Sequence, residues 1–154
     1  MVEVFKSELT IGETEIIKIQ ELLNLTFPES YKNFLLKNNG GKCNPKVFSF
    51  FENNRKTESY IEWFLAIYSG KFHNLKKYLL NYKLEEKRMP THIFPIAHDP
   101  GGNLICISCS GVDIGSIYFW NHELEVDYSQ ADDSDYSNLY LIDENFQFSL
   151  NKLH

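Results

Sequence analysis

Three short apolar segments, separated by two turn-forming segments, constrain the fold of this chain more than any other feature. The apolar segments are Ile93–His98, Leu104–Cys109 and Ser116–Asn121. The turn-forming segments between them are Asp99–Gly102 and Ser110–Gly115. Because glycine, proline and aspartate favour chain reversal in short connections, the three segments predict an antiparallel meander. Leu104–Ile107 is apolar at every position, which predicts a central strand with helices covering one side.

The first forty residues show two helical patterns. Apolar residues at helical spacing predict a helix near residues 11–24, and Thr10 and Glu13 form a capping-box pattern at its start. In the second pattern Pro28 falls in the first turn, where the missing amide costs nothing. Asn38–Gly41 tolerates positive φ and should end this helix. Together the two patterns predict a helical hairpin.

The rest of the chain alternates between strand-like and helical patterns. Alternating β-branched and aromatic residues predict strands over Val47–Phe51 and Ile61–Tyr68. Apolar residues on one side and lysines on the other predict a helix over Asn74–Lys87. A short strand over Leu139–Ile142 and a closing helix from Phe146 to Leu153 complete the pattern.

Length and composition support one folded domain spanning residues 1–154. Hydrophobic residues make up 43% of the chain, enough for a sizeable core, and no repeat or linker divides it. We therefore expect an α+β fold in which a single antiparallel sheet is packed by helices. No apolar run approaches the roughly 18 residues of a membrane-spanning helix, and no signal-peptide pattern opens the chain. Three cysteines suit a reducing compartment, so we expect a cytoplasmic protein.

Charge divides unevenly along the sequence. Residues 1–88 hold 14 lysines and arginines against 11 acidic residues, whereas residues 89–151 hold ten acidic residues and no lysine or arginine. Such a stretch forms either a solvated face that maintains solubility or a surface that meets a basic partner, because complementary fields speed association. Nucleic-acid binding is disfavoured, because it needs clustered lysines and arginines to neutralise phosphates.

Two groups of residues are candidates for a redox, metal or acid–base site. Cys106 and Cys109 lie on a predicted strand rather than at a helix N-terminus, and their spacing places them on opposite faces, as buried structural cysteines. The second group consists of His92, His98, Asp99 and His122. The two histidines on the first strand should share a face, so a weak metal or acid–base site is conceivable. The alternative is that these side chains shape a turn and pack at strand ends.

No other catalytic motif is visible. Gly101–Gly102 lies between two strands rather than before a helix, and no serine stands in Gly-x-Ser-x-Gly. The pair Asp132–Asp133 lies in a predicted exposed loop, residues 130–138, where burial would not raise a carboxyl pKa for acid catalysis. The sequence therefore predicts no enzyme, no cofactor and no metal.

Two stretches of the chain together resemble a known family. Leu25–Gly41 resembles the opening motif of the SUKH superfamily, in which proline, tyrosine and a closing asparagine–glycine–glycine recur. Phe94–Ile107 and Gly115–Glu123 resemble its central hairpin, although Phe27 and Asn121 replace a usual leucine and aspartate. The matching motif positions are Pro28, Tyr31, Gly40, Gly41, Pro95, Asp99, Gly102, Asn103, Gly115, Trp120 and His122.

The resemblance implies a curved antiparallel sheet packed by the N-terminal helical hairpin, a middle helix and a C-terminal helix. It implies that the motif positions set helix ends, turns and packing rather than catalysis. Small bacterial members are mostly immunity proteins, which bind a cognate toxin, often a nuclease, and hold it inactive. The superfamily also includes a yeast regulator of cell-wall synthesis.

Resemblance and charge together predict a cytoplasmic immunity protein that docks an acidic face against a basic nuclease toxin and blocks it by occlusion. The alternative is a non-catalytic scaffold or regulatory module with a housekeeping partner. Aromatic side chains beside acids supply desolvated contact area. The residues expected to contact the partner are Asp127, Tyr128, Asp132, Asp133, Asp135 and Tyr136.

Overall fold

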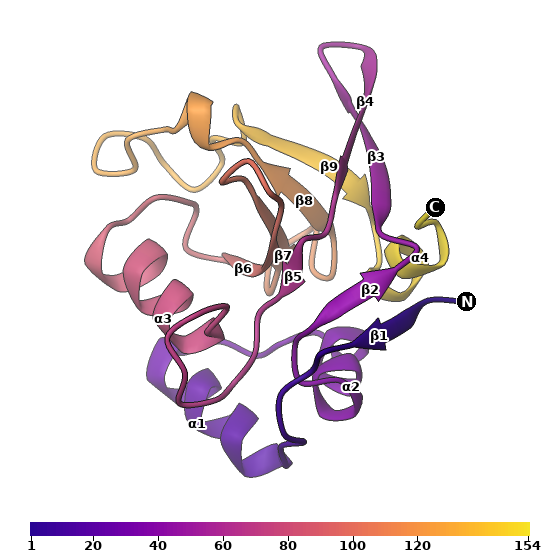
Figure 1. Ribbon diagram of the computed structural model, residues 1–154. Helices are drawn as coiled ribbons and strands as arrows, with labels where there is room; N and C mark the ends of the chain where they lie inside the picture. The colour runs from indigo at the N-terminus through magenta and orange to yellow at the C-terminus, as the bar shows by residue number, and fades with distance from the viewer.

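The computed structural model describes residues 1–154 and shows an α+β fold, as predicted (Figure 1). The strands are β1 (Glu3–Phe5), β2 (Lys42–Asn44), β3 (Val47–Glu52), β4 (Arg55–Tyr60), β5 (Trp63–Phe64), β6 (Ile93–His98), β7 (Leu104–Ser108), β8 (Ile117–Trp120) and β9 (Leu139–Asp143). The helices are α1 (Glu13–Leu23), α2 (Glu29–Lys37), α3 (Leu75–Leu79) and α4 (Phe146–Asn151), with a π-helical turn η1 (Leu80–Glu85) and a 3-10 turn η2 (His122–Leu124). None of the helices combines the length and the apolar character that crossing a bilayer requires.

The centre of the fold is a five-stranded antiparallel sheet with the order β5-β6-β7-β8-β9. The predicted meander forms its middle, and every residue of β7 is buried, as expected for a central strand. Ile105 and Ile107 face a large core that includes residues of α1, α2 and α4. Cys106 faces a smaller core, against which Tyr78 of α3 and Tyr82 of η1 pack. Both faces of the sheet are therefore covered, rather than one.

Two ribbons extend this sheet. β3 and β4 form a hairpin around Asn53–Asn54, whose positive φ values suit a tight turn, and this hairpin projects from the body of the molecule in Figure 1. β1 pairs with β2 in the second ribbon. The polar sequence of β4 gave no strand signal, since none of its side chains is buried. The predicted single sheet is thus a five-stranded sheet with two two-stranded additions.

The strand predicted over Ile61–Tyr68 forms only at Trp63–Phe64 and is wrong over the rest of its length. The chain turns because side chains and nearby loops take over the backbone hydrogen bonds. The amide of Ile67 donates to the Asn39 side chain, and Ala66 forms an isolated bridge with Asn74.

The two predicted N-terminal helices form, but with other caps. The backbone N–H of Gly12 donates to the Glu15 carboxylate over 2.9 Å at the start of α1. The predicted pairing of Thr10 with Glu13 is therefore wrong, because Glu15 occupies the third helical position, from which a carboxylate reaches the cap amide. Pro28 stands immediately before α2, with extended backbone, rather than inside its first turn.

Gly40 and Gly41 bring two backbone segments into contact instead of capping α2, which ends with Asn38 in an extended conformation. Gly40 has a φ of +71°, and a Cβ there would lie 2.6 Å from the Cβ of Ala66. Gly41 exchanges two backbone hydrogen bonds with Phe64, with N···O distances of 3.2 and 2.7 Å. The two glycines therefore join the β1–β2 ribbon to β5, an approach that a side chain would prevent.

The helix predicted over Asn74–Lys87 forms in two parts. The Asn74 side chain accepts a hydrogen bond from the Lys77 amide over 3.0 Å and so caps α3. After Leu79 the helix widens into η1, which ends at Glu85. A π-helical turn rotates the side chains that follow it relative to an α-helix, so the predicted lysine face is not kept throughout.

Hydrogen bonds of the Asn39 side chain connect the segments around Leu9, Asn39 and Ile67. Its side-chain Nδ2 donates to the carbonyl oxygens of Leu9 and Ile67 over 2.9 and 2.8 Å, and its Oδ1 accepts from the Ile67 amide over 2.8 Å. The residue is almost fully buried. All the donors and acceptors on this side chain are therefore used in an environment where water could not replace them.

Replacing Asn39 by alanine should lower the free energy of unfolding by roughly 2–4 kcal/mol, because three hydrogen bonds are lost and a buried amide is left unpaired. Denaturant unfolding followed by circular dichroism measures the effect. Asn38→Ala is the matched control, since the Asn38 side chain makes no hydrogen bond, and should change stability by less than about 0.5 kcal/mol. Equal losses in the two variants would contradict the role assigned to Asn39.

Candidate partner-binding surface

All the residues predicted to contact a partner lie in one segment, residues 125–138, between η2 and β9. We call it the acidic loop; it forms the light-orange excursion at the left of Figure 1. Asp127, Asp132 and Asp133 are exposed, whereas Asp135 and the two tyrosines of the loop are half-buried. The structure thus brings the predicted residues together but gives them different environments.

Three Asp-x-Ser turns shape the acidic loop. In each turn one carboxylate oxygen accepts hydrogen bonds from the backbone N–H and the hydroxyl of the serine two residues later. The turns pair Asp127 with Ser129, Asp132 with Ser134, and Asp135 with Ser137. Aspartate favours such turns because its short side chain reaches the backbone two residues on. The loop is therefore organised by its own acidic residues.

The same hydrogen bonds keep these aspartates charged. Donation from the serine hydroxyl and amide lowers the pKa of Asp127, of Asp132 and of Asp135. The donors are neutral, and none of the loop aspartates lies within 4.0 Å of a lysine, arginine or histidine nitrogen. The loop consequently carries negative charge that no cation of the chain neutralises by contact.

Tyr128 stabilises the acidic loop from within, and Tyr136 and Asp133 attach it to the rest of the fold. Tyr128 donates its hydroxyl to the Asp135 carbonyl over 2.5 Å, within the loop. Tyr136 donates to Asp113 over 2.7 Å, and Asp133 accepts from the amide and hydroxyl of Thr91 over 2.9 and 2.5 Å. These hydrogen bonds hold the loop in place, while Asp127 and Asp132 remain exposed to solvent.

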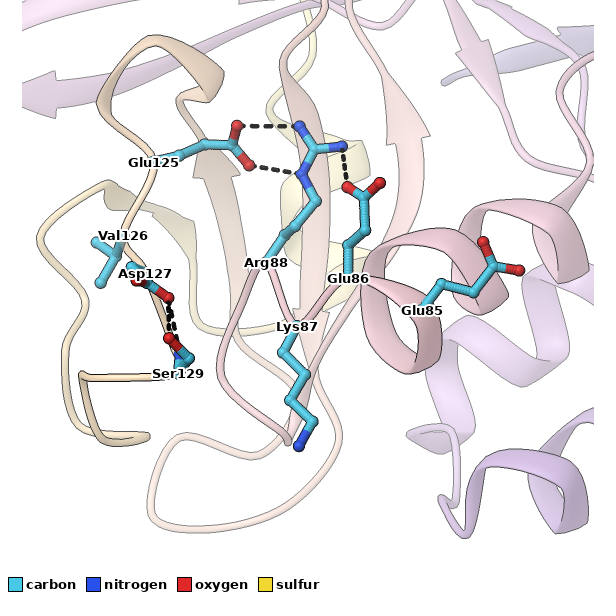
Figure 2. Close-up of a pocket in the computed structure, with 8 residues that line it drawn as sticks. All are labelled: Glu85, Glu86, Lys87, Arg88, Glu125, Val126, Asp127 and Ser129. Carbon is cyan, nitrogen blue, oxygen red and sulfur yellow. Dashed lines mark hydrogen bonds and ion pairs between the residues drawn. The ribbon is translucent and has the colours of Figure 1, made fainter.

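Arg88 fixes the start of the acidic loop, as Figure 2 shows. Its guanidinium donates two hydrogen bonds to the Glu125 carboxylate, over 2.6 and 3.0 Å, and lies 3.5 Å from Glu86. It also lies over the ring of Tyr82, 4.3 Å from the centroid. The Glu125 hydrogen bond raises the pKa of Arg88, so this bidentate pair stays ionised. Lys87 points away from the pair in Figure 2.

Several acids of the lysine-free stretch do not contribute to an acidic surface. Asp99 and Asp143 are buried, and Asp113 is half-buried beneath the loop. Asp113 accepts from the hydroxyls of Ser108, Tyr118 and Tyr136, each over 2.7 Å. The acidic face expected from the whole stretch is therefore concentrated in the acidic loop.

Three hollows surround the acidic loop. One of 660 Å³ lies between Arg88 and Ser129, and is the one drawn in Figure 2. A second of 310 Å³ lies beside Tyr128, and a third of 680 Å³ lies beside Tyr136. Exposed apolar side chains accompany them: Leu84 lines the second hollow, Val112 lines the third, and Leu124 directly precedes the loop. Apolar side chains beside fixed charges are the composition of a protein-binding surface.

The residues of the predicted family motif lie in turns and cores. Asp99 accepts from the amides of Gly101 and Asn103 over 2.8 Å each, which closes the β6–β7 turn. The Asn103 side chain accepts from the His122 amide over 3.1 Å and so ties this turn to the end of β8. Tyr31 and Trp120 are fully buried in the two cores. These positions shape the scaffold.

The histidines do not assemble into the site that was considered. A register shift between Pro95 and Ala97 interrupts the alternation of β6, and His92 and His98 have different partners at the two ends of this strand. His92 lies 2.5 Å from the Tyr136 hydroxyl, whereas His98 lies 2.8 Å from His73, a residue that the sequence pattern missed. No group of three metal-binding side chains occurs.

His73 and His98 share one hydrogen bond. The Nδ1 of His98 lies 3.0 Å from the Asp99 carbonyl, which only accepts, so this nitrogen carries a proton. In the neutral form of His98 its Nε2 accepts from the Nδ1–H of His73. The two rings stack with Trp63 on one side and Tyr78 on the other.

The cysteines match their predicted role. Cys106 and Cys109 are buried in opposite cores of the sheet, and neither forms a disulfide. Burial raises the pKa of both thiols, that of Cys109 to about 12, so neither is a thiolate at neutral pH.

The family model described as the SMI1 / KNR4 family (SUKH-1) matches residues 10–150. The chain belongs to this family. In this SUKH-1 protein the match extends from just before α1 through almost all of α4, so it includes the acidic loop as well as both cores. None of the curated proteins matches the chain.

We predict that the stability of the protein depends on pH through His73. Burial, His98 and Lys42 lower the pKa of His73, so the unfolded chain binds this proton more readily than the folded chain. The contribution of His73 should be complete above about pH 6.5 and should decline as the pH falls below that value. Unfolding in denaturant between pH 7.5 and 5 measures it.

The comparison variant is His73→Asn, because asparagine tolerates the φ of +53° at this position and does not titrate. Stability of the SUKH-1 protein should fall more steeply with acid than stability of the variant. Parallel pH profiles would contradict the lowered pKa of His73.

Proposed function

We propose that this chain is a cytoplasmic immunity protein that binds a cognate toxin with a basic nuclease domain and blocks it by occlusion, without catalysis. The observation that carries the proposal is the acidic loop, in which Asp127, Asp132 and Asp135 are held charged by neutral donors. A partner with a cationic surface would supply the missing counter-charges. Nucleases carry such surfaces because they bind phosphates.

The hydrogen bonds within the loop favour binding in a second way. Ordering a flexible loop on association costs conformational entropy, whereas the Asp-x-Ser turns order this loop beforehand. The cost of binding is therefore reduced before the partner arrives. Leu84 and Val112 would provide apolar contact area beside the charges.

Long-range attraction would guide the encounter. The chain has a formal net charge of −6 at pH 7, and residues 89–151 hold ten acidic residues and no lysine or arginine. Because charges act over about 8 Å at physiological ionic strength, such a concentration chiefly raises the association rate and orients the partner.

The test begins with affinity capture from lysate of the source organism, eluted by rising salt, with bound proteins identified by mass spectrometry. The proposal expects a basic partner that is released by salt and whose isolated C-terminal domain is a nuclease. Equimolar SUKH-1 protein should abolish that nuclease activity. A housekeeping partner retained at high salt would instead support the scaffold alternative.

Replacing Asp127, Asp132 and Asp135 together by asparagine should slow association with the captured partner roughly tenfold at low salt and flatten its salt dependence. Asparagine keeps an acceptor oxygen at each turn, so the loop geometry is retained while three charges are lost. Stopped-flow or surface-based kinetics at several salt concentrations measures the change.

The matched control replaces three exposed acids outside the loop, Glu3, Glu8 and Glu21, by glutamine, which changes the net charge equally. Association of the control should slow by no more than about twofold, as expected from net charge alone. Equal effects in the two variants would remove the acidic loop from the mechanism.

A further inference from the structure

Lys83 is a half-buried lysine among apolar side chains. It lies in the π-helical turn η1, and its Nζ donates a hydrogen bond to the Pro90 carbonyl and lies 4.6 Å from the centroid of the Phe94 ring. No carboxylate lies within 4.0 Å of it, unlike Arg88 a few residues later. An ammonium group in this position is half-buried and has no ion-pair partner.

The surroundings of Lys83 favour its neutral form. Burial lowers the pKa of Lys83 to about 8. Asp133, Cys106 and Cys109 oppose this shift, but both thiols are themselves protonated, and Asp133 is engaged with Thr91. With this pKa roughly a tenth of the amine is unprotonated at pH 7.

A hollow gives access to this amine. The hollow of 310 Å³ beside Tyr128 is lined by Lys83 itself and by apolar side chains from three segments: Leu23, Leu84, Met89 and Phe94. Its size falls at the lower limit of pockets that bind small molecules, and its walls would hold an apolar group. Tyr128 and Asp133 place it directly under the acidic loop.

We propose that Lys83 is a carbonyl-reactive residue, and that its hollow accepts a small apolar aldehyde, which forms an imine with Nζ. The lone pair of the neutral amine attacks the carbonyl carbon, and the N–C bond forms. The carbonyl oxygen leaves as water with the two amine hydrogens, so the step needs neither an oxidant nor a reductant. A desolvated lysine in an apolar pocket is the arrangement that activates lysine toward carbonyl compounds.

The experiment treats the intact protein with benzaldehyde and sodium cyanoborohydride at pH 7.4 and follows benzylation of each lysine by peptide mass spectrometry. The reductant traps the imine as a stable secondary amine. Lys87 is the internal control, because it lines the same hollow but is exposed. Lys83 should react about tenfold faster than Lys87, since its neutral fraction is far larger.

Two further measurements distinguish a specific reactivity of Lys83 from the reactivity of any solvent-accessible lysine. The Lys83 rate should level off above about pH 8, because most of this amine is then already neutral. In Lys83→Arg, which retains a cation at this position, the fast phase of incorporation should disappear and Lys87 should react at its former rate. A Lys83 rate equal to or below that of Lys87, or one that keeps rising well above about pH 8, would overturn the proposal.

Discussion

The burial of β7 on both faces is the constraint on which the rest of the structure depends. A strand that is apolar at every position requires two cores, and the remaining elements are arranged to supply them. Helices α1, α2 and α4 contribute to one core together with the two ribbons. Tyr78, Tyr82 and Tyr136 pack against the other. Because Tyr136 belongs to the acidic loop, the second core also determines where that loop lies.

The acidic loop is ordered without ion pairs to its aspartates. A loop fixed by salt bridges would be rigid, but its carboxylates would already be neutralised. Here neutral hydroxyls and amides fix Asp127, Asp132 and Asp135, so the loop is held in place and its charge stays available. Arg88 pairs with Glu125 at the start of the loop, where it orients the segment and neutralises Glu125 but leaves the four aspartates of the loop unpaired.

Much of the fold was predictable from sequence, because the meander strands and the closing helix carry strong periodic signals. The Ile61–Tyr68 segment was not, since alternation suggested a strand that Asn39 interrupts through hydrogen bonds from a distant position. The location of the acidic loop followed from charge, and the repeated Asp-x-Ser spacing was a visible signal of its turns. The half-buried position of Lys83 could not be foreseen, because the sequence pattern predicts a regular helix where the structure has a π-helical turn.

The central claim is that the acidic loop is ordered by its own aspartates before any partner binds. Amide hydrogen exchange of the free protein, measured by nuclear magnetic resonance at neutral pH, tests it most directly at Ser129, Ser134 and Ser137. The account predicts that these three amides exchange at least about tenfold more slowly than in an unstructured peptide of the same sequence. Exchange at the rate of the unstructured peptide would show that the turns do not persist, and would contradict the account.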